Sequence, residues 1–152
     1  MKGLYVNTND THGGAARAAV RIMQGVQQHG VGAQMLVKEK HSDSEQVVAL
    51  QQFVPKNRFY RITDWIAAKL KNKWQHLMWR PYRKTKENVF MSDMRSTRLH
   101  NALQRLDYDI LHLHWVNQRF LDVSELKRVN RPIVWTLHDS WPFCGVCHYF
   151  LY

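Results

Sequence analysis

Residues 2–37 read KGLYVNTNDTHGGAARAAVRIMQGVQQHGVGAQMLV, and this stretch decides the fold. Its first six residues have the apolar character of a buried strand, and a glycine pair follows at Gly13 and Gly14. From Ala15 to His29 apolar residues recur at helical spacing, and residues 33–37 predict a second strand. A strand, a tight glycine turn, a helix and a strand in fewer than forty residues form a βαβ unit. Such a unit predicts a parallel sheet with a right-handed crossover.

The rest of the chain continues to alternate strands and helices. Three further short apolar runs are expected to be strands, at Val47–Leu50, Asp109–Trp115 and Pro132–His138. Three helical segments are also expected: an amphipathic helix that ends at Pro81, an apolar face over Leu99–Leu106, and a short helix that Asp122 and Glu125 open as a capping box. We therefore expect an α/β fold with a Rossmann-like parallel sheet flanked by helices. Residues 1–152 form one domain, and we expect it to be the incomplete front piece of a larger protein.

Composition is ordinary for a globular protein, but the charge is concentrated in one segment. The chain is 45% apolar and 22% charged, with a net charge of +10. Between Lys56 and Lys86 there are ten Lys or Arg and one acid, so this segment carries +9 and all the rest only +1. A local excess of this kind indicates a local anionic partner or surface. No apolar run approaches the ~18 residues of a membrane span, and no signal peptide precedes the first strand, so a cytosolic protein is expected.

The basic segment contains the amphipathic helix. Five large apolar residues step by three or four and form what we call the apolar stripe: Ile62, Ile66, Leu70, Trp74 and Leu77. The cations that accompany it form the basic patch: Arg61, Lys69, Lys71, Lys73, Arg80, Arg83 and Lys84. Cations interleaved with Trp suit an anionic membrane interface, and they also suit nucleic acid. In a third interpretation the stripe packs on the sheet while the lysines face water.

The glycine turn is a candidate phosphate site. A helix N-terminus offers unpaired N–H groups and partial positive charge, and the absence of Cβ atoms at Gly13 and Gly14 lets phosphate oxygens approach. Arg17, one turn into the helix, could add a charged contact. The full dinucleotide pattern requires G-x-G-x-x-G, whereas this chain has only GG, which is also compatible with a purely structural turn.

Two further clusters carry chemistry near the end of the chain. His112 and His114 share one face of a strand, and His138 ends the next strand, so three imidazoles could hold a catalytic zinc ion. The alternative, which the lack of a recognisable acidic second shell favours, is that they are polar side chains packed beneath a crossover helix. Cys144, Cys147 and His148 spell C-x-x-C-H, the pattern of haem attachment, which the lack of an export signal disfavours. The pair could otherwise be half of a zinc or disulfide site, or two inert thiols.

Three blocks of sequence resemble a known family. NTNDTHGGAARAA (7–19), DILHLHWVNQRFLD (109–122) and PIVWTLHDSWPFCGVCHY (132–149) are similar to family-4 glycosyltransferases of bacterial exopolysaccharide and colanic-acid biosynthesis. The resemblance implies a GT-B enzyme, in which two Rossmann-like domains face a cleft and transfer a sugar from a nucleotide donor with retention and without an obligatory metal. This chain would be the acceptor-side, N-terminal domain, which is expected to be inactive without its nucleotide-binding partner domain.

The resemblance also implies roles for individual residues. Gly13 and Gly14 would meet the donor diphosphate, with Arg17 in the same turn. His138 would line the sugar-transfer site as the catalytic residue. The residues that would border the acceptor pocket are Asp139, Trp141, His114 and His148. Such proteins often have W-P-F-T-G-G-C-H where this chain has Cys144 and Val146 in place of the Thr and the second Gly.

The same resemblance sets the expected partners. They are a nucleotide-sugar donor, a saccharide or lipid-linked acceptor, and the anionic inner face of the cell membrane against the basic patch. No metal or other cofactor is expected, nor is nucleic acid. Two alternatives come from other classes of protein: a non-catalytic basic module that binds nucleic acid or membrane, and a metallohydrolase built on the three histidines.

Overall fold

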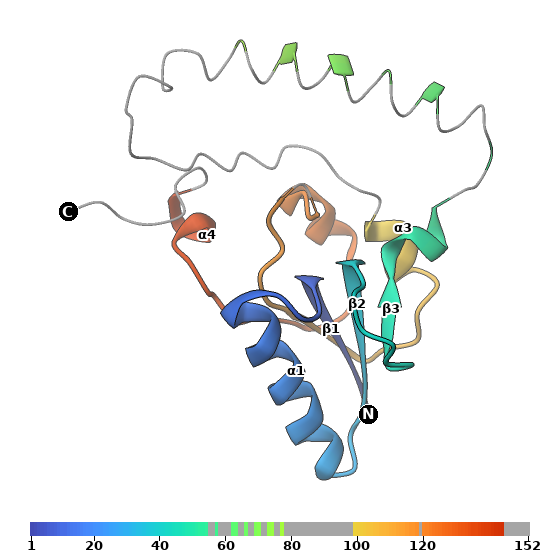
Figure 1. Cartoon of the computed structure of the whole chain (residues 1–152), viewed down its shortest axis with the longest axis vertical. Coiled ribbons are helices and arrows are strands. Elements are labelled where there is room, and N and C mark those ends of the chain that lie inside the picture. Colours follow the sequence, from blue (N-terminus) through green and yellow to red (C-terminus); the bar gives the residue numbers. More distant parts are fainter. Residues whose placement is uncertain are drawn as a thin grey trace.

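The computed structural model describes residues 1–54, 57, 62–63, 66, 69–70, 73–74, 77, 99–118 and 120–144. They form a five-stranded, wholly parallel sheet in the order β3-β2-β1-β4-β5. Figure 1 shows β1, β2 and β3 side by side. The strands are β1 (Lys2–Asn9), β2 (Gly32–Glu39), β3 (Val47–Ala49), β4 (Ile110–Leu113) and β5 (Ile133–Trp135). The helices are α1 (Gly13–Gln28), α3 (Leu99–Leu103) and α4 (Trp141–Cys144), with 3₁₀ helices at Leu50–Phe53 and Val123–Arg128. The predicted α/β fold with a Rossmann-like parallel sheet is confirmed.

Strand β1 is the centre of the sheet and separates two apolar clusters. It pairs with β2 on one side and β4 on the other, and its residues 4–8 are all buried. Successive side chains of a strand point to opposite faces, so Leu4 and Val6 enter one cluster while Tyr5 enters the other. Burial on both faces explains why the strand reads as a continuous apolar run rather than an alternating one.

Helix α1 covers the face that carries Tyr5. Its buried residues Ala16, Ala19 and Met23 lie on one side of the helix, and Ala19 and Met23 pack in the cluster of Tyr5. The small alanines let the helix axis lie close to the strands (Figure 1). The helix begins at Gly13, two residues before the predicted start at Ala15.

The larger cluster lies on the opposite face. It joins the inward residues of β1 and β4 to α3 and to Leu50 of the first 3₁₀ helix. Leu126 of the second 3₁₀ helix packs against its margin. The predicted short helix after Asp122 is present, with Asp122 as its N-cap. Residues Val123–Arg128 form a 3₁₀ helix, and the Asp122 side chain accepts a hydrogen bond from Ser124 N.

Strands β4 and β5 are shorter than the sequence predicted. Strand β4 ends at Leu113 and β5 ends at Trp135, so His114 and His138 lie in the loops that follow these strands. The register pairs Leu113 with Trp135, so both loops begin at the same level of the sheet. The two histidines therefore leave the sheet side by side.

The direction in which the chain fills the sheet reverses at β1. From β1 the chain moves outward through β2 to β3, whereas β4 and β5 lie on the other side of β1. In open α/β sheets ligands bind beyond the carboxyl ends of the strands at such a reversal. The loops after β1 and β4 are consequently where a ligand site is expected.

Strand β5 forms one edge of the described sheet. Among the described residues it pairs with β4 alone. Ile133 and Val134, whose side chains point to opposite faces, are both exposed. Both faces of this edge strand are thus open to solvent over the described part of the chain.

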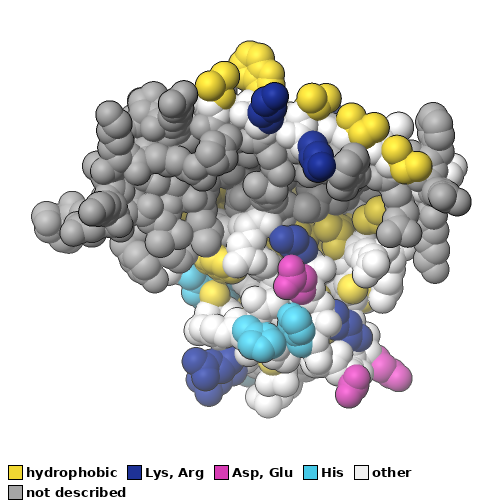
Figure 2. Space-filling view, turned by 45° about the horizontal axis from the view of Figure 1, so that its top comes forward, with side chains coloured by type: hydrophobic (Ala, Val, Ile, Leu, Met, Phe, Trp, Pro, Cys, Tyr) yellow, Lys and Arg dark blue, Asp and Glu magenta, His cyan; other side chains and the backbone are white. Residues whose placement is uncertain are grey.

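The apolar stripe faces solvent. Its five residues are helical, and each side chain is between 46% and 68% exposed. Figure 2 shows hydrophobic side chains in a row along one rim of the molecule, with Lys or Arg side chains beside them. None of the helices in the described residues has the length and apolar character to cross a membrane. The interpretation in which the stripe packs on the sheet is therefore wrong. Several residues with predicted roles lie outside the described residues: Arg61, Lys71, Arg80, Arg83, Lys84, Cys147 and His148.

Candidate functional site

The loop after β4 is fixed to the end of β1 by buried polar groups. Trp115 N donates to Asn7 Oδ1 at 2.9 Å, and Thr8 N donates to Trp115 O at 2.8 Å. The Thr8 hydroxyl lies 2.9 Å from Trp115 O and 3.1 Å from Asn117 O. Asn7 and Thr8 are themselves buried, so these bonds replace the water that the loop backbone would otherwise need.

Asp139 fixes the loop after β5 to the same place. Its carboxylate accepts hydrogen bonds from Trp115 Nε1 at 2.7 Å, from Asn117 Nδ2 at 2.9 Å and from Trp141 N at 3.2 Å. The side chain of Trp141 is buried in the larger cluster, 6.1 Å from the ring of Trp135. Of the residues predicted for an acceptor pocket, Asp139 therefore organises the loops and Trp141 packs in the core.

The structure brings the three predicted histidines together. The rings of His112 and His114 stack with centroids 4.4 Å apart, and those of His114 and His138 with centroids 5.3 Å apart. His114 Nδ1 lies 3.0 Å from His138 Nε2, and His112 Nε2 lies 2.8 Å from the Thr136 hydroxyl. One nitrogen of each ring is thus engaged, with another imidazole or with a hydroxyl. No group of His, Cys, Asp or Glu in the described part of the chain is arranged to hold a metal ion.

All three imidazoles favour the neutral form. Burial, with smaller contributions from the neighbouring His112 and His138, lowers the pKa of His114 to about 3. Burial also lowers the pKa of His112, with a smaller contribution from His138. The pKa of His138 is lowered by burial, against which the Asp139 carboxylate acts.

The hydrogen bond between His114 and His138 fixes their tautomers. His114 Nε2 is buried and has no hydrogen-bond partner. A buried acceptor without a partner is less costly than a buried N–H without one, so we assign the proton of His114 to Nδ1. His114 then donates to His138 Nε2, and His138 carries its own proton on Nδ1. His138 is consequently a neutral hydrogen-bond donor.

The glycine turn follows β1 at the same end of the sheet. Gly13 has a φ of 86°, which lies in the left-handed region, whereas Gly14 does not. A Cβ added at either residue would meet no atom within 4 Å, so the space in front of α1 is open. Arg17 is exposed, one turn into the helix. Because β1 and β5 are both neighbours of β4, the glycine turn and His138 flank the loop after β4.

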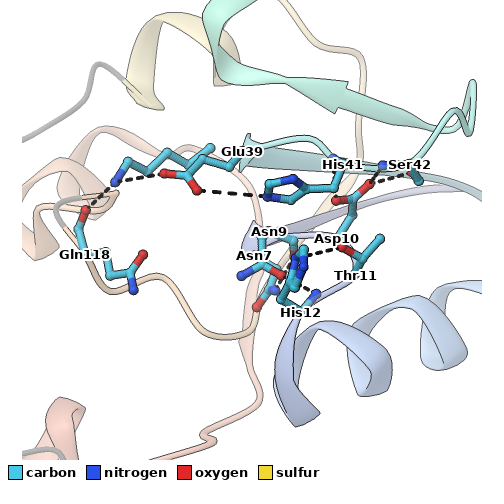
Figure 3. A network of polar contacts seen from close by, with 10 residues as sticks. Asn7, Asn9, Asp10, Thr11, His12, Glu39, His41, Ser42 and Gln118 are labelled. Atoms are coloured by element: carbon cyan, nitrogen blue, oxygen red, sulfur yellow. Dashed lines mark hydrogen bonds and ion pairs between the residues drawn. The ribbon is translucent and has the colours of Figure 1, made fainter.

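A second network, beside the glycine turn, was not predicted (Figure 3). The buried Asp10 carboxylate accepts hydrogen bonds from His41 N at 2.9 Å, from Ser42 N at 2.9 Å and from the Ser42 hydroxyl at 2.5 Å. Burial would raise the pKa of Asp10, but these hydrogen bonds outweigh it, and the pKa is lowered. The rings of His12 and His41 meet edge to face, 4.7 Å apart. The loop after β2 is thereby held against the loop that carries the glycines.

One signal for this network was present in the sequence. The two strands of a βαβ unit are commonly neighbours, and where they are, residues just after each strand lie close together. Residues 38–46 carry no recognisable motif, however, and the pairing of Asn9 with Glu39 that places His41 beside Asp10 is a property of the register.

Comparison of the chain with protein-family models, with curated proteins and with solved structures gives no match. The resemblance to glycosyltransferases therefore rests on the three blocks of sequence.

Proposed function

We propose that this chain is the acceptor-side domain of a retaining glycosyltransferase, which moves a sugar from a nucleotide donor to a saccharide or lipid-linked acceptor. One observation carries the proposal. An open glycine turn at a helix N-terminus and a neutral histidine flank the loop after β4, at the end of the sheet where the strand order reverses. That position is the usual ligand site of open α/β sheets.

The glycine turn suits the leaving diphosphate. As the glycosidic bond to the donor breaks, negative charge accumulates on the departing phosphate oxygens. The N–H groups and the dipole at the start of α1 would stabilise this charge without having to reorient. The absence of a Cβ at Gly14 leaves room for a phosphate oxygen at the helix end, and Arg17 could reach the same oxygen.

A neutral His138 suits the sugar. Positive charge develops at the anomeric carbon in the transition state, and an imidazolium beside it would oppose that charge. The lowered pKa of His138 avoids this opposition. The Nδ1–H that we assign to His138 would then hold a sugar hydroxyl in place by a neutral hydrogen bond.

Two glycine variants test the diphosphate site separately from the fold. Gly14→Ala is expected to leave the free energy of unfolding within about 0.5 kcal/mol of the parent, because its φ is ordinary and its surroundings are open. Gly13→Ala is expected to lose about 1–2 kcal/mol, because alanine is strained at a φ of 86°. Urea titration measures both values.

Binding is then measured by titrating the ¹⁵N-labelled protein with uridine, guanosine and adenosine diphosphates. At least one is expected to shift the amide resonances of Gly13, Gly14 and Ala15, and Gly14→Ala is expected to weaken that binding about tenfold or more. Binding is expected to be weak, because most of the donor nucleotide would be held by the partner domain. The diphosphate site proposed at the glycine turn is ruled out if none of the diphosphates at millimolar concentration moves these amides, or if Gly14→Ala binds as tightly as the parent.

A further inference from the structure

One residue in the loop after β4 has a backbone conformation that its type rarely adopts. Gln118 has a φ of 59°, and of the residues that the structure describes it is the one other than glycine with a positive φ. A side chain at such a φ is crowded by the backbone, whereas glycine adopts the same conformation without strain. Residues held in this way are concentrated at ligand sites, so the side chain of Gln118 is a candidate ligand contact.

Lys38 of β2 holds Gln118 in this conformation. Lys38 Nζ donates to Gln118 O at 2.8 Å, across 80 residues of sequence. The Lys38 side chain is only 27% exposed, and a hydrogen bond from a charged group is stronger than a neutral one. The Gln118 side chain is exposed and extends away from this bond (Figure 3). Its amide forms no hydrogen bond to any other residue that the structure describes.

Gln118 begins a row of polar groups at the carboxyl ends of β1 and β2 (Figure 3). Lys38 Nζ lies 3.8 Å from Glu39 Oε1, and Glu39 Oε2 lies 4.0 Å from His41 Nε2. The His41 ring meets His12, the residue before the glycine pair, with ring centroids 4.7 Å apart. The row therefore joins the loop after β4 to the glycine turn. We call its exposed members Gln118, Glu39 and His41 the polar rim.

We propose that the polar rim binds the saccharide acceptor, with Gln118 as the residue that selects it and Lys38 as the residue that positions Gln118. A sugar hydroxyl both donates and accepts hydrogen bonds. The amide of Gln118 does the same, the carboxylate of Glu39 accepts, and the imidazole of His41 offers a donor or an acceptor.

Charge favours a neutral ligand at the polar rim. The Glu39 carboxylate would repel a phosphate there, and its charge offsets that of Lys38. The choice of a saccharide over other hydroxyl-rich ligands rests on the proposed function. The residues differ, however, from those assigned above to the diphosphate and to the donor sugar.

The polar rim supplies exposed groups that the predicted acceptor residues do not. The Asp139 carboxylate accepts three hydrogen bonds from the loops, and the side chains of Trp141 and His114 are buried. A saccharide at this end of the sheet therefore needs other partners at the surface. Gln118 is retained at a φ that glycine would adopt more easily, which is consistent with its side chain being one of them.

Titration of the ¹⁵N-labelled protein with saccharides tests the inference. The probes are the methyl glycosides of glucose, galactose, mannose and N-acetylglucosamine, at concentrations up to about 0.1 M because single sugars bind weakly. At least one is expected to shift the side-chain NH₂ resonances of Gln118 and the backbone amide of His41. Gln118→Gly is expected to weaken that binding about fivefold or more, because the amide is lost.

The stability of Gln118→Gly separates a ligand contact from a structural role. Its urea midpoint is expected to equal or exceed that of the parent, because the strain that glycine relieves offsets its greater freedom in the unfolded chain. A lowered midpoint would show that the side chain serves the fold, and it would overturn the inference.

Two substitutions of Lys38 test its positioning role. Lys38→Met keeps most of the aliphatic stem but removes the ammonium group, so it is expected to shift the Gln118 backbone amide and to weaken saccharide binding about threefold or more. Lys38→Arg keeps a charged donor and is expected to retain most of the binding. The controls Gln52→Ala and Lys127→Met remove another exposed glutamine and another exposed lysine, and both are expected to bind as the parent does.

Three results of the titrations would overturn the inference. They are the absence of any shift at Gln118 with all four sugars, an equal loss of binding in the control variants, and shifts at Gln118 with nucleoside diphosphates in place of saccharides. The last would identify the nucleotide as the ligand of the polar rim. Shifts at the glycine turn with diphosphates but none at Gln118 with sugars would rule out the rim alone, and the reverse would rule out the diphosphate site alone.

Discussion

Replacing Asp139 by alanine is expected to lower the free energy of unfolding by about 3 kcal/mol. The carboxylate accepts hydrogen bonds from Trp115 Nε1, Asn117 Nδ2 and Trp141 N, and all three would lose their acceptor. Hydrogen bonds to charged groups contribute about 1.5–3 kcal/mol each, and water can replace only part of this loss where the donors are buried. Urea denaturation measures the change, and the indole N–H resonance of Trp115 is expected to move because its acceptor is gone.

Two further variants bracket this effect. Asp139→Asn keeps one carbonyl oxygen but turns an NH₂ group toward some of the donors, so an intermediate loss is expected. Asp43→Ala removes an exposed carboxylate and is expected to change stability by less than about 0.5 kcal/mol. A loss below about 1 kcal/mol for Asp139→Ala, with the Trp115 resonance unmoved, would show that Asp139 does not organise these loops.

The histidine stack is expected to make the fold sensitive to mild acid. The pKa of His114 is about 3 in the folded protein, against an ordinary value of 6.5. Between these values the unfolded chain binds a proton that the folded protein does not, so stability falls as pH falls from about 6.5. For His114 alone the free energy of unfolding is expected to drop by about 2 kcal/mol between about pH 7 and pH 5.

The neighbouring groups allow this contribution to be isolated. His112 and His138 also have lowered pKa values and act in the same direction. The lowered pKa of Asp10 matters only near and below its ordinary value of 3.8, outside this range of pH. In His114→Leu, the drop in the free energy of unfolding between about pH 7 and pH 5 is therefore expected to be about 2 kcal/mol smaller than in the parent. A smaller drop is expected to remain, because His112 and His138 are still present. If the free energy of unfolding of His114→Leu fell with pH as steeply as that of the parent, His114 would not be the source of the acid sensitivity.

The parts of the fold that are formed by residues close together in the sequence were predictable from the sequence. Strand β1, helix α1 and strand β2 follow one another in the chain, and their spacing was sufficient to predict a parallel sheet. The ends of β4 and β5 were less predictable, because His114 and Trp115 continue an apolar pattern without pairing as strand. Where a strand stops depends on its partner, and β5 pairs only as far as Trp135.

The candidate site was predictable in its residue types but not in its bonding. The two-residue spacing of His112 and His114 correctly placed them together, and the third histidine joins them as expected. That His114 Nδ1 lies within hydrogen-bond distance of His138 Nε2 depends on the register of β4 with β5. The contacts of Asp10 with His41 and Ser42 depend in the same way on the register of β1 with β2.

The orientation of the amphipathic helix could not be predicted. A period of 3.6 residues shows that apolar side chains share one face, but it does not show whether that face meets protein or solvent. Ile62 and Leu77 belong to a stripe that would suit a core equally well. Their exposure in the folded chain decides between the two.

The exposed edge at β5 bears on how this protein must be handled. The outer N–H and C=O groups of β5 have no partner strand among the described residues. The exposed Ile133 and Val134 are β-branched, which favours pairing of this edge with another extended chain. We expect this edge to be able to pair with an extended chain, although its three residues keep such pairing short. A lysine introduced at Val134 would be the simplest guard against such pairing.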